Sequence, residues 1–456
     1  MREVRGVGLG FRPRLAAALL GAPGRVDFVE VVAEACRDGA ARREALAVAE
    51  LWPVVPHGVK LSLGGADGLD EGRAREFGKL ARELRAPLVS EHVSFVRAGG
   101  REIGHLTELP MTREAVKVVA RNVVALRRHL PDVPLLLENV ARAFLWADHE
   151  MGEGAFYHEI ARATGCELLL DVGNLYANAR NAGLDPLALL ADYPLERVRM
   201  VHVAGGVFEC GFYYDTHAHP VPEAVFELVE RVLGARPDAA VLLERDDAFD
   251  DVPAVLAEID RLRAMWAGGG GGPPPRARPP GRGGGETIAG REGPPPLPPP
   301  PGRGEDRAVG LVEAQAELAR RLTDVDAGAG AALLRARSVL EKKRADDALP
   351  LLPSLGPRVA PERALALGRL ARAPRLPAMN AVADAMRIAA ASRREPDLAR
   401  AAARDMLCLR ARFAGGPEGP RPRALPWAGR EVLEGGDTVW AWKGFGRSSA
   451  VRLRGR

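Results

Sequence analysis

The first 265 residues repeat one pattern, in which a short apolar run of β type ends in polar residues and a longer segment follows. Amphipathic segments at 70–85, 112–130, 222–233 and 252–265 have the spacing of helices. Thr112, followed by Ala115 and Val116, is a good N-cap for one of them. The predicted strands are Gly6–Gly10, Phe28–Val32, Val54–His57, Leu88–His92, Leu135–Glu138, Leu168–Asp171, Val198–Val203 and Val241–Glu244.

Eight strands, each followed by a helix, fit a (β/α)8 barrel, the TIM-barrel fold, within this length. A doubly wound parallel sheet is the alternative. Two features favour the barrel: no G-x-G-x-x-G motif follows the first strand, and polar residues end almost every strand. The fold class is therefore predicted as α/β with a (β/α)8 barrel at its N-terminal end.

A Gly- and Pro-rich stretch from Ala267 to about Arg307 divides the chain. It has almost no apolar residues, so it cannot bury enough surface to offset the entropy of ordering. A structureless loop of about 40 residues inside one compact domain would be unusual. Beyond it, apolar residues recur at helical spacing. We predict a barrel domain at 1–266, a disordered linker at 267–307, a small helical domain at 308–415 and an irregular basic tail at 416–456, in which Thr438–Trp442 and Ala450–Leu453 could form a hairpin.

The two halves differ in charge. Residues 1–265 carry 31 Lys and Arg against 40 Asp and Glu, a net charge of −9, and residues 266–456 carry 33 against 20, a net charge of +13. The basic residues of the second half are interspersed with acids and alanines and few aromatics, which favours a solvated helical surface over a nucleic-acid site.

The chain shows no secretory signal and no apolar run long enough to span a membrane, so we expect a cytoplasmic protein without a membrane partner. Its four cysteines are scattered without CxxC spacing, which disfavours disulfides and a Cys-based zinc site.

Histidines and carboxylates end six successive predicted strands, and all nine histidines of the chain lie between His57 and His219. The strand ends of a (β/α)8 barrel meet at one mouth, where active sites lie. So many imidazoles and carboxylates would repel and desolvate one another without a cation. Mixed His and carboxylate ligation suits iron, manganese or zinc better than calcium or magnesium. The sequence therefore predicts a site for more than one metal ion.

Several motifs resemble those of the multinuclear non-heme iron-dependent oxidative enzymes, a family formerly described as a domain of unknown function that includes the methanobactin-biosynthesis oxidase. The resemblance covers Gly6 to about Asp247. The matching stretches are Gly8–Arg12, His57–Gly64, Ser90–His92, Leu109–Thr112, Glu138–Asn139, Asn174–Ala179, Asp215–His217 and Leu243–Asp246.

The resemblance implies a TIM barrel that holds two or three iron ions, with zinc or manganese as alternatives. The implied metal ligands are His57, His92, Glu138, Asp171, Asn174, His202, Asp215, His217 and Glu244. Residues that could contact substrate or orient ligands are Glu30, Glu34, His105, Asn139, His219 and Arg245.

Members of that family use iron and dioxygen to oxidise cysteines of ribosomally made precursor peptides, often with a partner protein. The implied function is thus an O2-dependent peptide oxidase, in which the helical domain or a separate protein recruits the substrate. Three motifs depart from the family pattern. Gly173 stands in place of an Asn, Gly206 in place of the last His of His-x-Ala-Gly-His, and Val32 in place of the His of Glu-Val-His-Ala-Glu-Asn.

Two other functions remain open from the residues alone. A metal-dependent sugar isomerase of the xylose-isomerase type, or a phosphodiesterase of the abasic-site endonuclease type, would also place His, Glu and Asp at strand ends. The isomerase would need a buried Lys, and Lys60 is the only Lys near a strand end, while the phosphodiesterase would need a basic barrel. The third possibility is a non-catalytic interaction protein in which the metal is structural.

Overall fold

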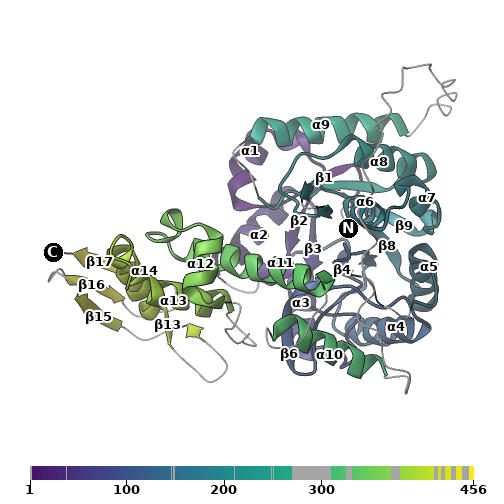
Figure 1. The fold of residues 1–456 in the computed structure, drawn as a ribbon. Helices are drawn as coiled ribbons and strands as arrows, with labels where there is room; N and C mark the ends of the chain where they lie inside the picture. The colour runs from purple at the N-terminus through teal and green to yellow at the C-terminus, as the bar shows by residue number, and fades with distance from the viewer. Residues whose placement is uncertain are drawn as a thin grey trace, which may run out of the picture. The chain divides into compact units, whose positions relative to one another are not determined.

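In the computed structural model, eight parallel strands close into a barrel in the order β1-β12-β9-β8-β7-β4-β3-β2, which confirms the predicted fold class (Figure 1). The structure describes residues 3–36, 39–144, 146, 149–209, 211–247, 249, 251–269, 310–324, 331–370, 380–414, 420–422, 427–432, 438–443 and 451–455. The barrel strands are β1 (Val7–Gly10), β2 (Phe28–Val32), β3 (Val54–Gly58), β4 (Val89–His92), β7 (Leu135–Glu138), β8 (Glu167–Asp171), β9 (Val198–Val203) and β12 (Ala240–Leu243).

The barrel interior has two layers, because successive residues of a strand point to opposite faces and residues two apart share a face. The lower layer is an apolar cluster that includes Phe28, Val55, Leu88, Leu136, Leu169, Met200 and Leu242. Two residues further along six of these strands stand Glu30, within β2, and His57, Glu138, Asp171, His202 and Glu244, which lie within one residue of the ends of their strands. We call these six residues the upper layer; the alternation places them toward the mouth.

Helices surround the strands (Figure 1). They are α1 (Ala16–Gly21), α2 (Gly39–Leu51), α3 (Glu71–Glu83), α4 (Arg113–Arg127), α5 (Glu153–Thr164), α6 (Val172–Ala182), α7 (Pro186–Ala191), α8 (Glu223–Ala235) and α9 (Val252–Gly269). The predicted cap is confirmed, since the Thr112 side chain accepts a hydrogen bond from the backbone N–H of Ala115. Asp171 caps α6 in the same way and so joins the end of β8 to the helix that follows it.

Two hairpins were not anticipated from the sequence. After β4 the chain forms β5 (Phe95–Ala98) and β6 (Arg101–Thr107), and after β9 it forms β10 (Val207–Glu209) and β11 (Phe212–Tyr214). Gly99 and Gly100 turn the first hairpin with positive φ angles of 56° and 71°, a conformation that glycine adopts without steric cost. Both hairpins follow barrel strands at the end where the polar residues stand.

The described residues divide into two compact units, Met1–Val96 with Leu106–Val312, and Arg97–His105 with Glu313–Arg456. The helices of the C-terminal part are α10 (Leu311–Thr323), α11 (Ala331–Ala348), α12 (Pro361–Gly368), α13 (Asn380–Ser392) and α14 (Ala399–Arg412). Alanine-rich faces of α11 to α14 enclose an apolar core that includes Ala385, Ile388 and Leu398. The predicted linker lies almost wholly outside the described residues.

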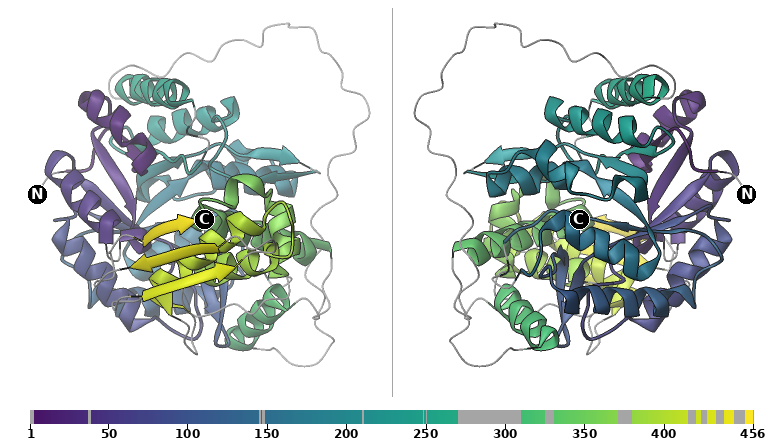
Figure 2. Two further views of the ribbon diagram at one scale, coloured as in Figure 1. Left: turned by 90° about the vertical axis from the view of Figure 1, so that its left-hand side faces the viewer. Right: turned by 90° about the vertical axis from the view of Figure 1, so that its right-hand side faces the viewer.

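The C-terminal tail is not irregular where the structure describes it. Three antiparallel strands, β15 (Trp427–Val432), β16 (Thr438–Lys443) and β17 (Val451–Gly455), form a sheet, drawn in yellow in Figure 2. The pairing of β16 with β17 confirms the predicted hairpin, and β15 is an additional strand. Two short strands, β13 (Phe413–Ala414) and β14 (Arg421–Pro422), pair separately. None of the helices in the described ranges has the length and apolar character needed to cross a bilayer.

Candidate metal centre

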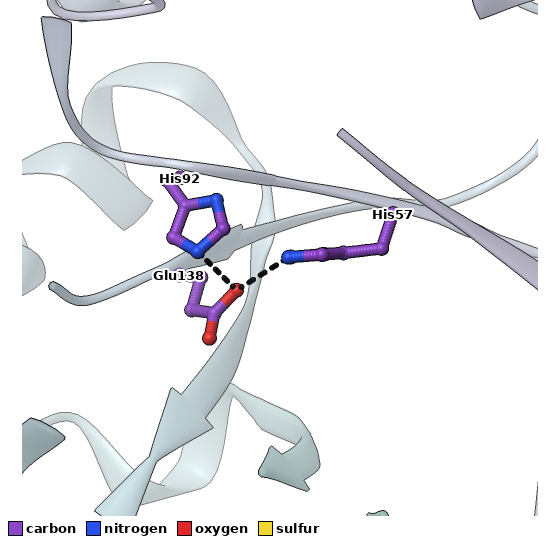
Figure 3. A group of neighbouring side chains, drawn as sticks. All are labelled: His57, His92 and Glu138. Atoms are coloured by element: carbon purple, nitrogen blue, oxygen red, sulfur yellow. Dashed lines mark ion pairs between the residues drawn. The ribbon is translucent and has the colours of Figure 1, made fainter. Parts of the chain in front are cut away.

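The first group of potential ligands comes from three neighbouring strands of the barrel. His57 is the penultimate residue of β3, His92 is the last residue of β4, and Glu138 is the last residue of β7. Figure 3 shows the two rings pointing at the same carboxylate oxygen: Glu138 Oε2 lies 3.4 Å from His57 Nε2 and 3.2 Å from His92 Nε2. All three side chains are buried.

Glu138 also belongs to a second group, with Asp171, His202 and Glu244. His202 Nδ1 lies 3.2 Å from Glu138 Oε1 and 3.2 Å from Glu244 Oε2. The two oxygens of Glu138 therefore face different groups. Glu138 would therefore be available as a ligand to both groups.

A third group lies nearer to solvent and contains His217, Glu244 and Asp246. His217 Nδ1 lies 3.2 Å from Glu244 Oε2 and 3.8 Å from Asp246 Oδ2. The side chain of Asp246 is 43% exposed, whereas that of Glu244 is 9% exposed. In each of the three groups, one potential ligand atom per residue lies within 4.8 Å of the others. Glu244 joins the third group to the second as Glu138 joins the second to the first.

A protein oxygen fixes the other nitrogen of each of these four rings. His57 Nδ1 lies 2.9 Å from Ser90 Oγ, and His92 Nδ1 lies 3.1 Å from the Gly58 carbonyl oxygen. For His202 and His217 the fixed nitrogen is Nε2, which lies 3.0 Å from Glu30 Oε2 and 2.7 Å from Asp215 Oδ2, respectively. Such contacts set ring orientation and tautomer in metal sites.

The charges of the site shift the pKa values of its members in opposite directions. Burial would raise the pKa of Glu138, but the charges of His92, His202 and His57 lower it to about 2. Burial lowers the pKa of His92 to about 4 despite the nearby Glu138 charge. Burial and the Asp215 charge raise the pKa of Asp171 well above its ordinary value. Without a metal ion, the cluster thus holds one carboxylate, Asp171, whose pKa burial and a like charge raise, beside another, Glu138, whose pKa the histidine charges lower.

Four buried atoms of the site have charged or polar neighbours but make no hydrogen bond of acceptable geometry within the described residues: Glu138 Oε2, Asp171 Oδ2, His202 Nδ1 and Asp215 Oδ1. Unpartnered buried polar atoms cost about 1–3 kcal/mol each, so native structures rarely gather several in one place. Carboxylate oxygens and imidazole nitrogens are the donors that iron, manganese and zinc accept. The residues present therefore fit divalent metal ions.

The two remaining predicted ligands, Asp215 and Asn174, make contacts of a different kind. Asp215 contacts His217, as described above. Asn174, in the first turn of α6, donates from its amide Nδ2 to the Asn139 carbonyl oxygen over 3.0 Å. Asn139 in turn accepts from the Asp171 N–H over 2.8 Å and donates to the Asp171 carbonyl over 2.9 Å. Asn139 is thus placed to hold the end of β8 against the end of β7.

The other predicted residues lie outside the three groups. Glu34 accepts hydrogen bonds from the backbone N–H groups of Val59 and Lys60, which supports the turn after β3. His219 Nδ1 lies 2.7 Å from Thr216 Oγ1. Arg245 is buried and forms an ion pair with Glu258 at 2.6 Å. His105 lies on β6, in the other compact unit.

Sequence reasoning missed Asp246 as a member of the site, and it missed Arg12 and Ser90 as partners of the site. Arg12 Nη2 forms an ion pair with Asp246 and lies 3.6 Å from Glu244 Oε1. The spacing in Glu244-Arg245-Asp246 could have indicated Asp246, because two acids that are two residues apart can face the same side of an extended chain. In the structure, Arg245 between them pairs with Glu258 instead.

The closed parallel barrel, with His and carboxylate side chains clustered at its mouth, places the chain among (β/α)8 proteins whose strand ends could hold metal ions. Within that class the assignment is specific. A family model described as RiPP precursor modification enzyme MbnB/TglH/ChrH matches residues 6–267, and the chain belongs to this enzyme family. The resemblance stated from the sequence motifs is thereby confirmed.

Individual relatives match the same part of the chain. A UPF0276 protein of Streptomyces avermitilis is 42% identical over 266 residues, which cover 57% of this chain and 54% of that protein. The match thus spans about half the length of that relative. A UPF0276 protein of Caulobacter vibrioides is 39% identical over 265 residues, covering 58% of this chain and 94% of the relative.

Solved structures resemble the barrel more distantly. Endonuclease IV from Thermus thermophilus is 23% identical, with a TM-score of 0.39, and the match covers 58% of this chain and 99% of that one. A xylose isomerase domain protein from Planctomyces limnophilus is 15% identical, with a TM-score of 0.39, over 59% of this chain and 100% of that one.

One departure from the family motifs lies where the structure leaves no room for a side chain. Gly206, at the position of the family's last His, donates its N–H to Tyr213 Oη over 2.9 Å. A Cβ at this position would lie 2.2 Å from the Tyr214 carbonyl oxygen and 2.7 Å from the Tyr213 ring. The β10–β11 hairpin therefore occupies the space that a side chain at 206 would need.

Proposed function

We propose that this chain is a multinuclear iron-dependent oxidase that uses dioxygen to modify cysteine residues of a ribosomally made precursor peptide. The observation that carries the proposal is the linked arrangement of three ligand groups, in which Glu138 and Glu244 are each shared, inside a barrel of this enzyme family. A structural metal site is usually closed by four ligands around one ion. Three linked groups exceed what a structural site requires.

The proposed ligands are His57, His92, Glu138, Asp171, Asn174, His202, Asp215, His217 and Glu244, with iron in two or three positions. Bound iron would supply the redox chemistry with dioxygen. The chain's own residues orient and shield that chemistry. Ser90, Gly58 and Glu30 hold the imidazole rings, and complete burial of Asp171 and His202 keeps water from the inner groups.

The entrance for substrate is proposed on the side of the third group. The His217 side chain is 14% exposed and that of Asp215 is 11% exposed, whereas that of His202 is fully buried. A peptide thiol could approach there without crossing the apolar layer below.

We also propose a role for the C-terminal part, which carries the net charge of +13 beyond residue 265. A Gly- and Pro-rich tether such as the one predicted at 267–307 keeps a binding module at high effective concentration near the barrel. A basic module suits an acidic segment of a precursor peptide. The division into barrel, linker, helical domain and tail belongs to this proposal.

The test is metal analysis and O2 uptake with the full chain purified anaerobically. We expect about two or three irons per chain and O2 consumption that depends on a Cys-containing peptide encoded beside this gene. The peptide with Cys replaced by Ser is the control. A chain that binds only zinc and takes up no O2 after iron loading would contradict the proposal.

A sugar isomerase is not favoured by the described structure. The three lysines of the barrel part, Lys60, Lys79 and Lys117, are all exposed, so none is placed to shuttle a proton inside the barrel.

A further inference from the structure

Two buried tyrosines outside the three ligand groups stack on each other beside the barrel. Tyr157 lies on α5 and Tyr193 follows α7. Both side chains are buried. The ring centroids are 5.3 Å apart and the ring planes differ by 18°, which is a stacked arrangement. The two phenol rings therefore form one continuous aromatic contact in the protein interior.

The Tyr193 phenol has a carboxylate as its hydrogen-bond acceptor. Its O–H donates to Glu153 Oε1 over 2.6 Å, a distance at which a base can take a proton. The same oxygen accepts from the Asn178 amide Nδ2 over 2.9 Å, and Glu153 Oε2 lies 2.8 Å from Arg142 Nη2. The Glu153 side chain is 4% exposed and that of Arg142 is 11% exposed. The carboxylate is thus held in place as the proton acceptor of this phenol.

This network is more polar than packing alone requires. A buried ion pair adds little to stability compared with well-packed apolar side chains, because desolvation of the two charges offsets their attraction. Apolar side chains in place of Glu153 and Arg142 would avoid that cost. The buried charges therefore point to a chemical use of the phenol and the carboxylate that it contacts.

Tyr157 lies between this network and the proposed metal centre. Its phenol group is in hydrogen-bond contact with the backbone of Val140, two residues after Glu138, and the charge of Glu138 acts on it. Burial, followed by the Glu153 charge, raises the pKa of both phenols well above their ordinary value, so both keep their protons at neutral pH. Loss of an electron makes a phenol O–H strongly acidic. The electron therefore leaves readily where a base takes the proton, as Glu153 does for Tyr193.

We propose that Tyr157 and Tyr193 form a redox-active pair that reduces an oxidised metal ion in the barrel when no peptide substrate is present. The inference rests on the proposed function. Tyr193 loses one electron, which passes through the stacked ring of Tyr157 and reduces the metal ion by one unit of charge. The Tyr193 O–H bond breaks and its proton moves to Glu153 Oε1, which leaves a neutral phenoxyl radical and a carboxylic acid. A thiol from solution then returns an electron, and Glu153 returns the proton. The pair thereby protects the histidine ligands from oxidation.

The first test uses the metal-free full chain. It is oxidised with a photoexcited ruthenium bipyridine complex, with persulfate as the electron acceptor, and radicals are recorded by EPR and transient absorption. We expect a long-lived tyrosyl signal in the wild type, because Tyr193 is buried and its proton has an acceptor. Tyr193→Phe loses this signal. Glu153→Gln loses it too, since Gln keeps the acceptor oxygen but does not take the proton. Because the chain has five tyrosines, single Phe variants are enough to assign the signal.

Tyr176→Phe is the matched control. Tyr176 also has a tyrosine neighbour, Tyr213, with ring centroids 5.1 Å apart, but these two rings meet edge to face and the Tyr213 oxygen accepts the Gly206 N–H. This variant should keep the long-lived signal. If Tyr193→Phe does not fold, a fluorinated tyrosine incorporated at position 193 makes the same assignment, because its radical has a different EPR spectrum.

The second test mixes the iron-loaded full chain with dioxygen in the absence of peptide and freezes the sample for EPR. We expect a radical that depends on Tyr193, and mass spectrometry should find more oxidised histidine in Tyr193→Phe than in the wild type. The inference is overturned if photo-oxidation gives the same radicals in both proteins, or if the iron-loaded wild type takes up O2 without a radical that depends on Tyr193. Absence of O2 uptake overturns the proposed function and with it the role given to the pair, whereas the photochemical test decides separately whether the pair is redox-active.

Discussion

The upper and lower layers of the barrel use the same strands for opposite purposes. On β7, Leu136 is completely buried among apolar side chains, and Glu138, two residues later, is equally buried among imidazoles. On β9 the same step leads from Met200 to His202. Burial of the lower residues is favourable at about 25 cal/mol per Å² of apolar surface. Burial of the upper residues is unfavourable unless charges of opposite sign offset it.

This difference in the free energy of burial indicates that the lower layer stabilises the barrel, whereas the polar side chains of the upper layer serve the chemistry of the site at a cost in stability. The two layers are only one strand repeat apart, so a substitution in either can be compared with a substitution two residues away on the same strand. Such pairs separate effects on metal binding from effects on folding.

The largest expected effect is on metal binding by Glu138→Ala. Glu138 is shared by two of the three groups, so its loss should weaken iron binding at both by more than about 100-fold, since even outer partners of metal ligands contribute 10–100-fold. Iron content and chelator competition measure this. Far-UV circular dichroism should remain that of the wild type; a collapse of the fold would show that the upper layer also stabilises the barrel.

Leu136→Ala on the same strand should do the reverse. Removing a fully buried Leu side chain costs about 2–5 kcal/mol in the free energy of unfolding, depending on how far the cavity relaxes. The barrel transition in a urea titration measures it. Iron stoichiometry should be unchanged, and a loss of iron comparable to that of Glu138→Ala would break the distinction between the layers.

The smallest effect concerns Glu108, a buried carboxylate outside both layers. Burial raises the pKa of Glu108 from 4.5 to about 7, whereas the pKa of the equally buried Glu138 is lowered to about 2 by histidine charges. Because the folded chain holds the Glu108 proton more tightly than the unfolded chain, this stabilisation is complete below pH 4.5 and is lost as the pH rises through about 7. The loss should be at most about 3 kcal/mol.

Urea titrations at pH 5.5 and pH 8 of the wild type and Glu108→Gln measure this contribution. Gln keeps a carbonyl oxygen for the hydrogen bond that Glu108 Oε1 accepts from the Phe144 N–H. The variant should therefore show less decrease in stability between the two pH values. An identical pH dependence in both proteins would mean that Glu108 is ionised throughout.

The barrel could be predicted from the sequence because apolar strands and longer helical segments alternate along the chain, and a closed (β/α)8 barrel requires this alternation. The bounds of Phe28–Val32, Leu135–Glu138 and Val198–Val203 match the observed strands, since each is an apolar run with clear polar ends. The β5–β6 and β10–β11 hairpins were missed because their strands are short and one or two glycines turn them inside what reads as a loop. Strand β15 was missed because Gly429 interrupts a short mixed run.

Only part of the candidate site could be predicted from the sequence. Residues at strand ends, such as His57 and Glu138, follow from topology, because closure of the barrel brings strand ends together. Residues in the loops after the strands do not. Spacing along the chain cannot tell which nitrogen of His217 faces Asp215 and which faces Asp246, since that depends on the left-handed backbone at His217 and on Arg12 from the opposite end of the domain.

The close fit of the β10–β11 hairpin over Gly206 leaves no room for a side chain at this position. A backbone carbonyl, that of Tyr214, limits the space, so no exchange of a neighbouring side chain alone would admit a larger residue at 206. An imidazole at 206 would require that the hairpin at 207–214 be rebuilt. Any redesign of this corner of the mouth therefore has to begin with the hairpin backbone and not with residue 206.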